Sequence, residues 1–422
     1  MVVYPLIRLI INQKPKSNMT KKMRYKRSSF LIDQILNNEA LPACYSEIQN
    51  TIAPHIAFKN KNKTHHTNNE TLKSTFDVPS YIKPVLNNQL RTYNELIAPL
   101  YAGFLINLSA YANFQDYINK KVRKARWSQL KRYKKRLDLC LQPTYKIYYG
   151  NNLEKNEYDQ LFKTLRVITE QRFQQKEEFN FEVPFLELYQ QIMYPLIQDK
   201  KAAIFVIYHQ DKPINITLNF IMGNTFFHWN SCYDVKYAVF NLGHINVVNH
   251  LEWCFNNDFK VFDMGRGDFL HKRKWVDTTY LYNEHVVYNK KSTMATLTAY
   301  CKTGSITIRY YSIQALKKIK LHILYSKFVH LKYRWLTKKV LNNATASIKV
   351  NNNATMPNTT NLITINPFDS KYETLTEPLN YFLHRNQERF SDVKVYNEKK
   401  HPNLFYFKGI KKTLSVQIVT KA

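Results

Sequence analysis

Between residues 77 and 341 the chain alternates short apolar runs with longer helix-forming stretches, and this pattern predicts most of the ordered structure. The apolar runs have the length of buried strands and lie at 103–109, 144–150, 202–210, 213–222, 225–233, 260–264 and 279–289. Stretches rich in helix-forming residues lie between them, at 114–138, 152–176, 183–199 and 244–257. Two-residue separators join the three central runs, as in antiparallel hairpins. The sequence therefore predicts an α+β protein with a mixed, mostly antiparallel sheet flanked by helices.

Two polar segments, 59–75 and 342–361, interrupt this pattern near the ends of the chain. Both are rich in Asn and Thr and have little apolar surface to bury, which is typical of linkers. We therefore predict that residues 1–75 form a disordered, basic lead-in. Residues 342–422 are predicted to be a linker followed by a C-terminal tail of unknown role.

A cationic amphipathic helix is predicted within residues 291–341. Its apolar residues recur at intervals of three and four and form one stripe, which consists of Leu321, Leu324, Phe328, Leu331 and Trp335. Lysine and arginine surround the stripe, and no acidic residue occurs from Arg309 to Asn343. Packing of the stripe on the sheet is the simpler interpretation. The alternative is that the helix lies in the interface of an anionic membrane.

The net positive charge of the chain indicates anionic binding partners. There are 62 Lys and Arg residues against 31 Asp and Glu, a net charge of +31. Such a field attracts nucleic acid, anionic lipid head groups or acidic small molecules. A general excess of Asn, Lys, Ile and Tyr is an alternative, non-functional explanation. The basic residues are densest over 120–136, where Trp127 and Tyr133 interleave with them and no acid occurs.

The cysteine pattern and the first residues of the chain indicate the cellular compartment of the protein. The five cysteines are widely spaced and include no CxxC pair, so we expect neither a zinc site nor a disulfide framework. The opening apolar stretch is interrupted by Pro5 and Arg8, which predicts neither a transmembrane helix nor a signal peptide. A cytoplasmic protein without a metal is expected, and the cationic helix adds a peripheral position at the inner membrane face as an alternative.

Glycine is rare, with eight residues in the chain, and three of the eight are Gly243, Gly265 and Gly267. Gly243 lies where the helix predicted at 244–257 begins. Free N–H groups and the helix dipole favour an anion at such a place, and a diphosphate is the obvious candidate. A simple helix cap is the alternative interpretation.

The residues around these glycines carry a family resemblance. The first part of the pattern consists of Tyr233, Asp234, Tyr237 and Gly243, and the second of Asp263, Arg266, Gly267, Asp268, Lys272 and Trp275. Together they resemble the CelD/BcsL-like branch of the GNAT acyltransferase superfamily, over about residues 95 to 340. One departure is His271, which occupies the position of the family's usual tyrosine.

The resemblance implies a GNAT fold, doubled as in the FemAB-like transferases, with residues 76–150 as its N-terminal part and 151–290 as its core. It also implies acyl-coenzyme A as donor. The residues expected to bind this donor are Leu242, Gly243, His244, Ile245 and Lys272. Contacts to the acceptor, a small or lipid-linked amine or hydroxyl such as a sugar or cell-envelope precursor, are expected from Arg172, Tyr237, Arg266 and Trp275.

Acyl transfer also needs a base for the proton of the acceptor. The leading candidate is His271, whose unperturbed pKa suits proton transfer near neutrality, and Asp263 and Asp268 are alternatives. Each of these residues also has a structural explanation: His271 as a solvated loop residue, Asp263 as a loop cap, and either aspartate as an ion-pair partner of Arg266. Trp275 has one as a core residue. Two other functions fit the same composition: an aminoacyl-tRNA-dependent FemAB-like transferase, and a non-enzymatic nucleic-acid-binding protein.

Overall fold

One continuous sheet of nine strands organises most of the chain, in this computed structural model that describes residues 25–36, 45–53, 55–59, 71–87, 91–342, 347–352, 354–357 and 361–419. Its order is β1-β4-β12-β6-β11-β10-β9-β8-β7. The strands are β1 (Tyr25–Ser29), β4 (Leu72–Pro79), β6 (Tyr93–Asn107), β7 (Thr144–Tyr148), β8 (Ala202–His209), β9 (Lys212–Met222), β10 (Thr225–Tyr233), β11 (Val261–Arg266) and β12 (Thr278–Asn289). Only the pairs β1–β4 and β10–β11 are parallel. The predicted α+β class with a mixed, mostly antiparallel sheet is confirmed.

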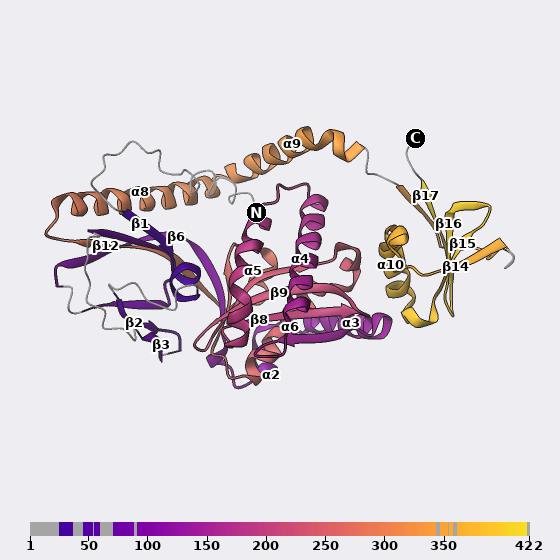
Figure 1. The fold of residues 1–422 in the computed structure, drawn as a ribbon, viewed down its shortest axis with the longest axis horizontal. Coiled ribbons are helices and arrows are strands. Elements are labelled where there is room, and N and C mark those ends of the chain that lie inside the picture. The colour runs from indigo at the N-terminus through magenta and orange to yellow at the C-terminus, as the bar shows by residue number, and fades with distance from the viewer. Residues whose placement is uncertain are drawn as a thin grey trace.

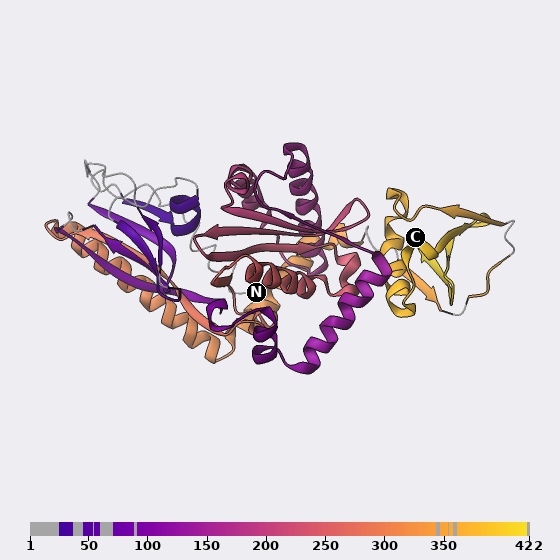
Figure 2. The same cartoon turned by 90° about the horizontal axis from the view of Figure 1, so that it is seen from below.

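The central lobe, residues 108–276, has helices on both faces of this sheet (Figures 1 and 2). On one face lie α4 (Lys155–Gln175) and α5 (Val183–Gln198), and on the other α2 (Phe114–Lys121) and α6 (Leu242–Asn256). Because both faces are covered, every residue of β8 is buried, and most of β9 is as well. The helix predicted at 114–138 is broken at Val122, and its second part is α3 (Lys124–Leu141).

The N-terminal lobe consists of β1, β4, a small sheet and the adjoining halves of β6 and β12. The small sheet has the order β3-β2-β5, with β2 (Tyr45–Asn50), β3 (His55–Lys59) and β5 (Ile82–Leu86). A π-helical segment, η1 (Phe30–Leu36), follows β1. The prediction of a disordered lead-in over residues 1–75 is therefore wrong for the described part of it. Phe30, Tyr45 and Ile48 are fully buried there, and their partners come from far along the chain.

The predicted C-terminal tail is a folded unit (yellow in Figure 1). Its sheet is antiparallel, in the order β13-β17-β16-β15-β14, with β13 (Ser347–Asn351), β14 (Leu362–Ile365), β15 (Lys394–Glu398), β16 (His401–Lys408) and β17 (Thr413–Val419). One helix, α10 (Thr376–Asn386), packs against α3 and against η3 (Val235–Phe240), the 3₁₀ turns before α6. One apolar cluster joins the unit to the central lobe, and it includes Leu379, Phe407, Phe240 and Leu242.

A pair of long helices, α8 (Thr293–Lys318) and α9 (Leu321–Asn342), replaces the single helix that was predicted within 291–341. The helices are separated at Lys320, which has a φ of 60°. In Figure 1 they run along the upper edge of the molecule, α8 beside the N-terminal lobe and α9 beyond it. None of the helices in the described ranges combines the length and apolarity needed to cross a bilayer.

Candidate active site

The parallel strands β10 and β11 pair over three residues only and then separate. The paired residues are Thr225–Phe227 on β10 and Val261–Asp263 on β11. Beyond them β10 has a bulge between His228 and Asn230, and β11 has one between Asp263 and Arg266. Gly265, in the second bulge, has a φ of 69°, a conformation that side chains disfavour. The separated strand ends leave polar backbone on β10 that does not pair with β11, and the candidate site is built around it.

Lys272 places its ammonium group at the end of β11. Its Nζ donates hydrogen bonds to the carbonyl oxygens of Met264 (2.5 Å) and Arg266 (2.7 Å). Burial lowers the pKa of Lys272 to about 8, although Asp263 acts in the opposite direction. An ammonium has three N–H groups, so these contacts leave one for another acceptor. Lys272 was predicted to contact the donor; the structure places it beside the strand separation.

His228 and Asn230 lie on β10, and the charge of Lys272 acts on His228. The sequence favoured a packing role for His228 and did not single out Asn230. Burial, with Lys272 as the next contributor, lowers the pKa of His228 to about 3. Its Nε2 and the Oδ1 of Asn230 are buried and have no hydrogen-bond partner within the described part of the chain. The signal in the sequence was a cluster of polar residues, His228, Asn230 and Ser231, in the second half of the strand 225–233. Unpaired buried polar atoms of this kind are costly unless something binds them.

His271 lies on the short helix α7 (Leu270–Arg273) and stacks on Phe269, with ring centroids 5.4 Å apart. Its side chain reaches solvent, but the surrounding protein reduces its hydration. This effect, followed by the charges of Lys272 and Arg172, lowers the pKa of His271 to about 4. The imidazole is therefore neutral throughout the neutral range, and the lowered pKa makes it a weaker base than an ordinary histidine.

Arg172, at the end of α4, lies over the unpaired edge of β10. Its guanidinium donates to the carbonyl oxygen of Ser231 (3.2 Å) and lies 5.0 Å from the ring centroid of Tyr233. The charge of Lys176 also acts on His271 and lowers the pKa of that ring. Arg172, Lys176 and Lys272 thus converge on the same place from two helices, and they give it a positive potential that suits an anionic ligand.

The first turn of α6 is partly covered. Leu242 and Ile245 are fully buried beneath the C-terminal unit, and the N–H of Ile245 donates to the carbonyl oxygen of Asn241 at 3.3 Å. Gly243 is partly exposed, and a Cβ at that position would lie 3.6 Å from the ring of Tyr233, an ordinary contact. The space in front of this turn therefore accepts a methyl group but nothing much larger on its Tyr233 side.

His244 and Trp275 form a stacked group with Arg126 of α3. The Nε1 of Trp275 donates to Nδ1 of His244 (3.2 Å), and the guanidinium of Arg126 lies 4.4 Å from the centroid of the Trp275 ring. Burial and the charge of Arg126 lower the pKa of His244 to about 4. Trp275 is fully buried, so the structure gives it the packing role and not the predicted contact to an acceptor.

Asp263 is enclosed by protein groups. Its Oδ2 accepts hydrogen bonds from the hydroxyls of Tyr81 and Tyr280, each at 2.6 Å, and its Oδ1 accepts one from the N–H of Gly265 at 2.6 Å. Burial raises the pKa of Asp263 despite these bonds. Because both oxygens are engaged and the side chain is fully buried, this geometry fits a structural acid that joins the lobes. It does not fit a base that contacts an acceptor.

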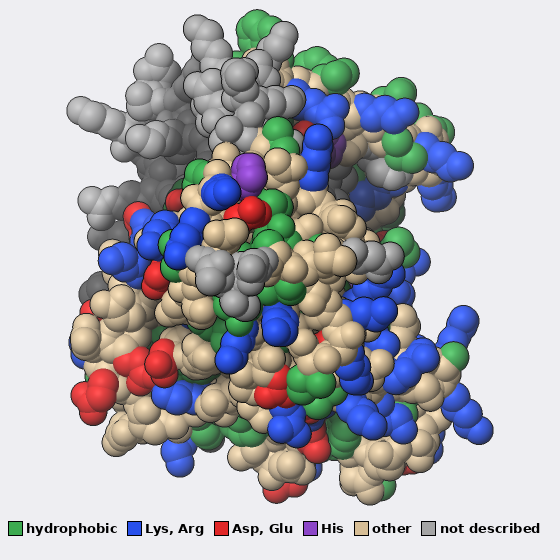
Figure 3. All heavy atoms as spheres, turned by 90° about the vertical axis from the view of Figure 1, so that its right-hand side faces the viewer, with side chains coloured by type: hydrophobic (Ala, Val, Ile, Leu, Met, Phe, Trp, Pro, Cys, Tyr) green, Lys and Arg blue, Asp and Glu red, His purple; other side chains and the backbone are tan. Residues whose placement is uncertain are grey.

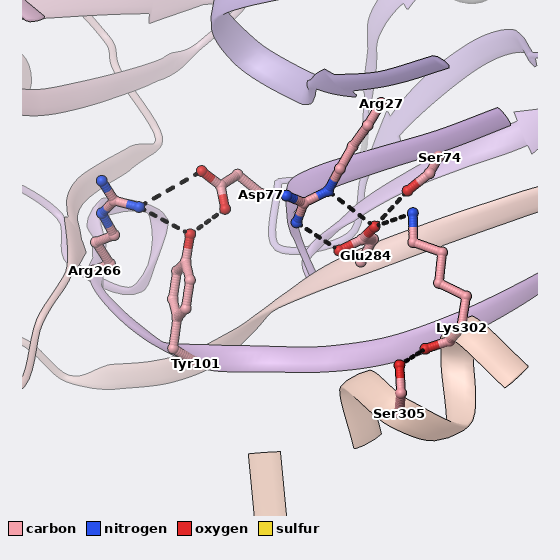
Figure 4. Close-up of polar contacts among 8 residues, drawn as sticks. All are labelled: Arg27, Ser74, Asp77, Tyr101, Arg266, Glu284, Lys302 and Ser305. Carbon is pink, nitrogen blue, oxygen red and sulfur yellow. Dashed lines mark hydrogen bonds and ion pairs between the residues drawn. The ribbon is translucent and has the colours of Figure 1, made fainter. Parts of the chain in front are cut away.

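Arg266 turns toward the N-terminal lobe (Figure 4). Its guanidinium donates to the hydroxyl of Tyr101 (3.1 Å) and lies 3.7 Å from the carboxylate of Asp77, which also accepts from Tyr101. A second buried group lies nearby, where Glu284 binds Arg27 (2.9 Å) and Lys302 (2.7 Å). Burial lowers the pKa of Lys302 to about 7. Arg266 therefore links the glycine turn to the N-terminal lobe.

The other two predicted residues lie apart from the strand separation. Asp268 forms an exposed ion pair with Arg273, whose hydrogen bonds lower the pKa of Asp268. Tyr237 is fully buried, its hydroxyl lies 3.2 Å from Nδ1 of His209, and the C-terminal unit covers it. Sequence reasoning placed both near the substrates, and the structure brings neither of them there.

Comparison with known proteins supports a transferase. The family described as acetyltransferase (GNAT) domain matches this chain from residue 123 to 273. The central lobe resembles a GNAT acetyltransferase domain. That range contains Arg172, Gly243, His271 and Lys272. The narrower CelD/BcsL-like assignment stays a prediction, and no curated protein matches the chain.

Solved structures show weaker likenesses. FemX has 10% identity and a TM-score of 0.38, and the match covers 54% of this chain and 74% of FemX. The C-terminal domain of a putative lysylphosphatidylglycerol synthetase from Agrobacterium fabrum has 10% identity and a TM-score of 0.32, with 54% and 70% covered. A tandem GNAT protein from the clavulanic acid biosynthesis pathway has 8% identity and a TM-score of 0.27, with 51% and 64% covered. Among the described residues of this chain, no group of three or more His, Cys, Asp or Glu side chains is placed to hold a metal ion.

Proposed function

We propose that this protein transfers an acyl group from acyl-coenzyme A to an amine or hydroxyl, at the place where β10 and β11 separate. The observation that carries the proposal is the ammonium of Lys272, held by two carbonyl oxygens of β11 beside the unpaired edge of β10. The GNAT match over 123–273 supports the reaction class. The acyl donor would lie along the unpaired edge of β10, with its carbonyl group near Lys272.

The residues present fit the phosphates of such a donor. The first turn of α6 offers the backbone N–H of Gly243, where the helix dipole favours an anion, whereas the N–H of His244 donates to the carbonyl oxygen of Asn241 at 3.1 Å. Arg172 and Lys176 add positive charge on the other side of the strand separation. When bound, coenzyme A supplies an activated thioester and a thiolate leaving group. The chain supplies the rest, which is orientation of the two reactants, a positive charge and a base.

Two side chains divide the catalytic work. The acceptor nitrogen or oxygen attacks the thioester carbonyl carbon, and negative charge develops on the carbonyl oxygen. In this proposal the remaining N–H of Lys272 stabilises the oxyanion, and such stabilisation accounts for about 100- to 1000-fold in rate in comparable sites. His271, neutral at physiological pH, accepts the proton of the acceptor. The carbon–sulfur bond then breaks, and the thiolate leaves.

A second donor is favoured by the exposed face of α3. This helix buries Leu130 and Leu137 and exposes Lys131 and Arg132, and its Arg126 lies 3.4 Å from Nδ1 of His244 at the start of α6. Figure 3 shows Lys and Arg side chains over much of the face at the C-terminal end of the molecule. A nucleic-acid carrier of the acyl group, such as aminoacyl-tRNA, would find this surface complementary.

Donor binding is expected to separate these possibilities. Calorimetric titration with acetyl-coenzyme A should show binding, and replacing Gly243 with leucine should weaken it about tenfold or more, because the side chain would fill the space before the α6 turn. Gly243→Ala is the matched control, since its methyl group fits beside Tyr233. Protection of aminoacyl-tRNA from hydrolysis, with no heat from any acyl-coenzyme A, would transfer the donor role to tRNA. Absence of both would overturn the proposal.

The pH dependence of the rate is expected to follow Lys272. The ammonium form is present below its pKa of about 8 and is lost above it, so transfer should slow as the pH rises through that value. The neutral form of His271 persists across the neutral range, so no loss is expected between pH 7 and its pKa of about 4 from that residue. A rate measured from neutral to alkaline pH that keeps rising past the pKa of Lys272 would contradict this assignment.

A further inference from the structure

The helices α8 and α9 each expose apolar side chains to solvent. On α9 the predicted stripe is exposed, with exposed fractions of 62% for Leu324 and Phe328, 65% for Leu331 and 77% for Trp335. On α8 the exposed apolar residues are Met294, Leu297, Tyr300, Ile308 and Tyr311. The simpler expectation, that the stripe packs on the sheet, is therefore wrong. Contiguous exposed apolar surface of this kind marks an interaction site.

The opposite side of each helix explains why the stripe faces outward. On α9, Tyr333 is buried and packs edge to face on Phe179 with ring centroids 5.2 Å apart, and Arg334 binds Glu177 at 2.6 Å. On α8, Ala295 and Ala299 are fully buried and join an apolar cluster with β12. The body of the protein thus holds the two helices by one side, and their apolar side remains available to a partner.

Charge selects the partner. Lys320, Lys327 and Lys332 flank the stripe at the positions that border an a/d seam, and the sequence from Arg309 to Asn343 contains no acid. A second copy of this chain docking on the same stripe would bring like charges together. An anionic lipid bilayer offers acyl chains to the apolar stripe and negatively charged head groups to the lysines beside it.

We propose that α8 and α9 dock on the surface of an anionic membrane, with the stripe from Leu321 to Trp335 inserted at the level of the head groups. The exposed Trp335 is suited to that depth, because an indole has an apolar body and a polar N–H. Lysines beside the stripe then contact the lipid phosphates while their apolar stems cover the edges of the stripe. Docking of this kind does not depend on acyl transfer.

Flotation of the full-length protein with vesicles tests the proposal. The protein should float with vesicles of phosphatidylcholine containing phosphatidylglycerol, and not with phosphatidylcholine alone, because charge and apolar insertion act together. The double variant L324E/F328E should reduce the bound fraction about tenfold or more. Ile410→Glu, in the C-terminal unit and 75% exposed, is the matched control and should float like the natural chain.

A second variant tests the flanking charges without changing the apolar stripe. K327E/K332E leaves the stripe intact and reverses two flanking charges, so it should bind anionic vesicles weakly and keep its helical circular dichroism. Equal flotation of all variants would overturn the proposal. So would dimer formation in light scattering that L324E/F328E abolishes, since a second copy would then be the partner. Tight duplex RNA binding that survives L324E/F328E, without flotation, would likewise show a nucleic-acid surface.

Discussion

Replacing Lys272 with methionine is expected to lower kcat by about 100-fold or more, with little change in the affinity for acyl-coenzyme A. Methionine keeps most of the side-chain volume and removes the ammonium that β11 carbonyl oxygens hold beside the separated strands. The charge is needed when the oxyanion forms, so the loss should appear in the chemical step. The measurement is release of coenzyme A thiol in the presence of a panel of amine and hydroxyl acceptors.

Lys260→Met provides the control, because Lys260 is exposed and adjoins the opposite end of β11. It should retain the natural rate. A Lys272→Met protein that is folded and transfers acyl groups at the natural rate would remove Lys272 from the mechanism. A selective loss of donor affinity would instead make Lys272 a binding residue, as the sequence alone suggested.

Replacing Asp263 with alanine is expected to lower the free energy of unfolding by about 3 kcal/mol or more. The change leaves the buried hydroxyls of Tyr81 and Tyr280 and the N–H of Gly265 without their common acceptor. Urea denaturation followed by circular dichroism measures the effect. Asp268→Ala removes only an exposed ion pair and should change stability by less than about 1 kcal/mol. Equal stability of the two variants would contradict the structural role of Asp263.

The central lobe was predictable because its signals are local. Apolar runs separated by two-residue turns identify β8, β9 and β10. The neighbouring glycines Gly265 and Gly267 identify the bend at the end of β11. The N-terminal strands were missed because their partners are distant: β1 pairs with residues 72–76, and Tyr81 meets Asp263 across 182 positions. The C-terminal unit was missed because the Asn-rich segment before it reads as a linker.

The sequence predicted several residues of the candidate site but not how they are arranged in space. Lys272, His271, Arg172 and Gly243 do lie around the separation of β10 and β11. Asp263 and Trp275 belong to the same sequence motif, but the structure uses them to hold the lobes and the core. A motif records which residues occur together; which of them face solvent depends on strand bulges and on helices from other parts of the chain.

The two lobes are joined by β6 and β12, which run without interruption from one lobe into the other. A hinge motion between the two lobes is disfavoured, because bending the shared sheet would break the hydrogen bonds between β6 and β12. Movement near the strand separation is therefore expected in smaller segments, such as the turn from 176 to 182 between α4 and α5, which begins at Lys176. That turn bears Glu177 and Phe179, the residues on which α9 rests. A displacement of α9 would thus be passed to the turn that begins at Lys176, whose charge acts on His271.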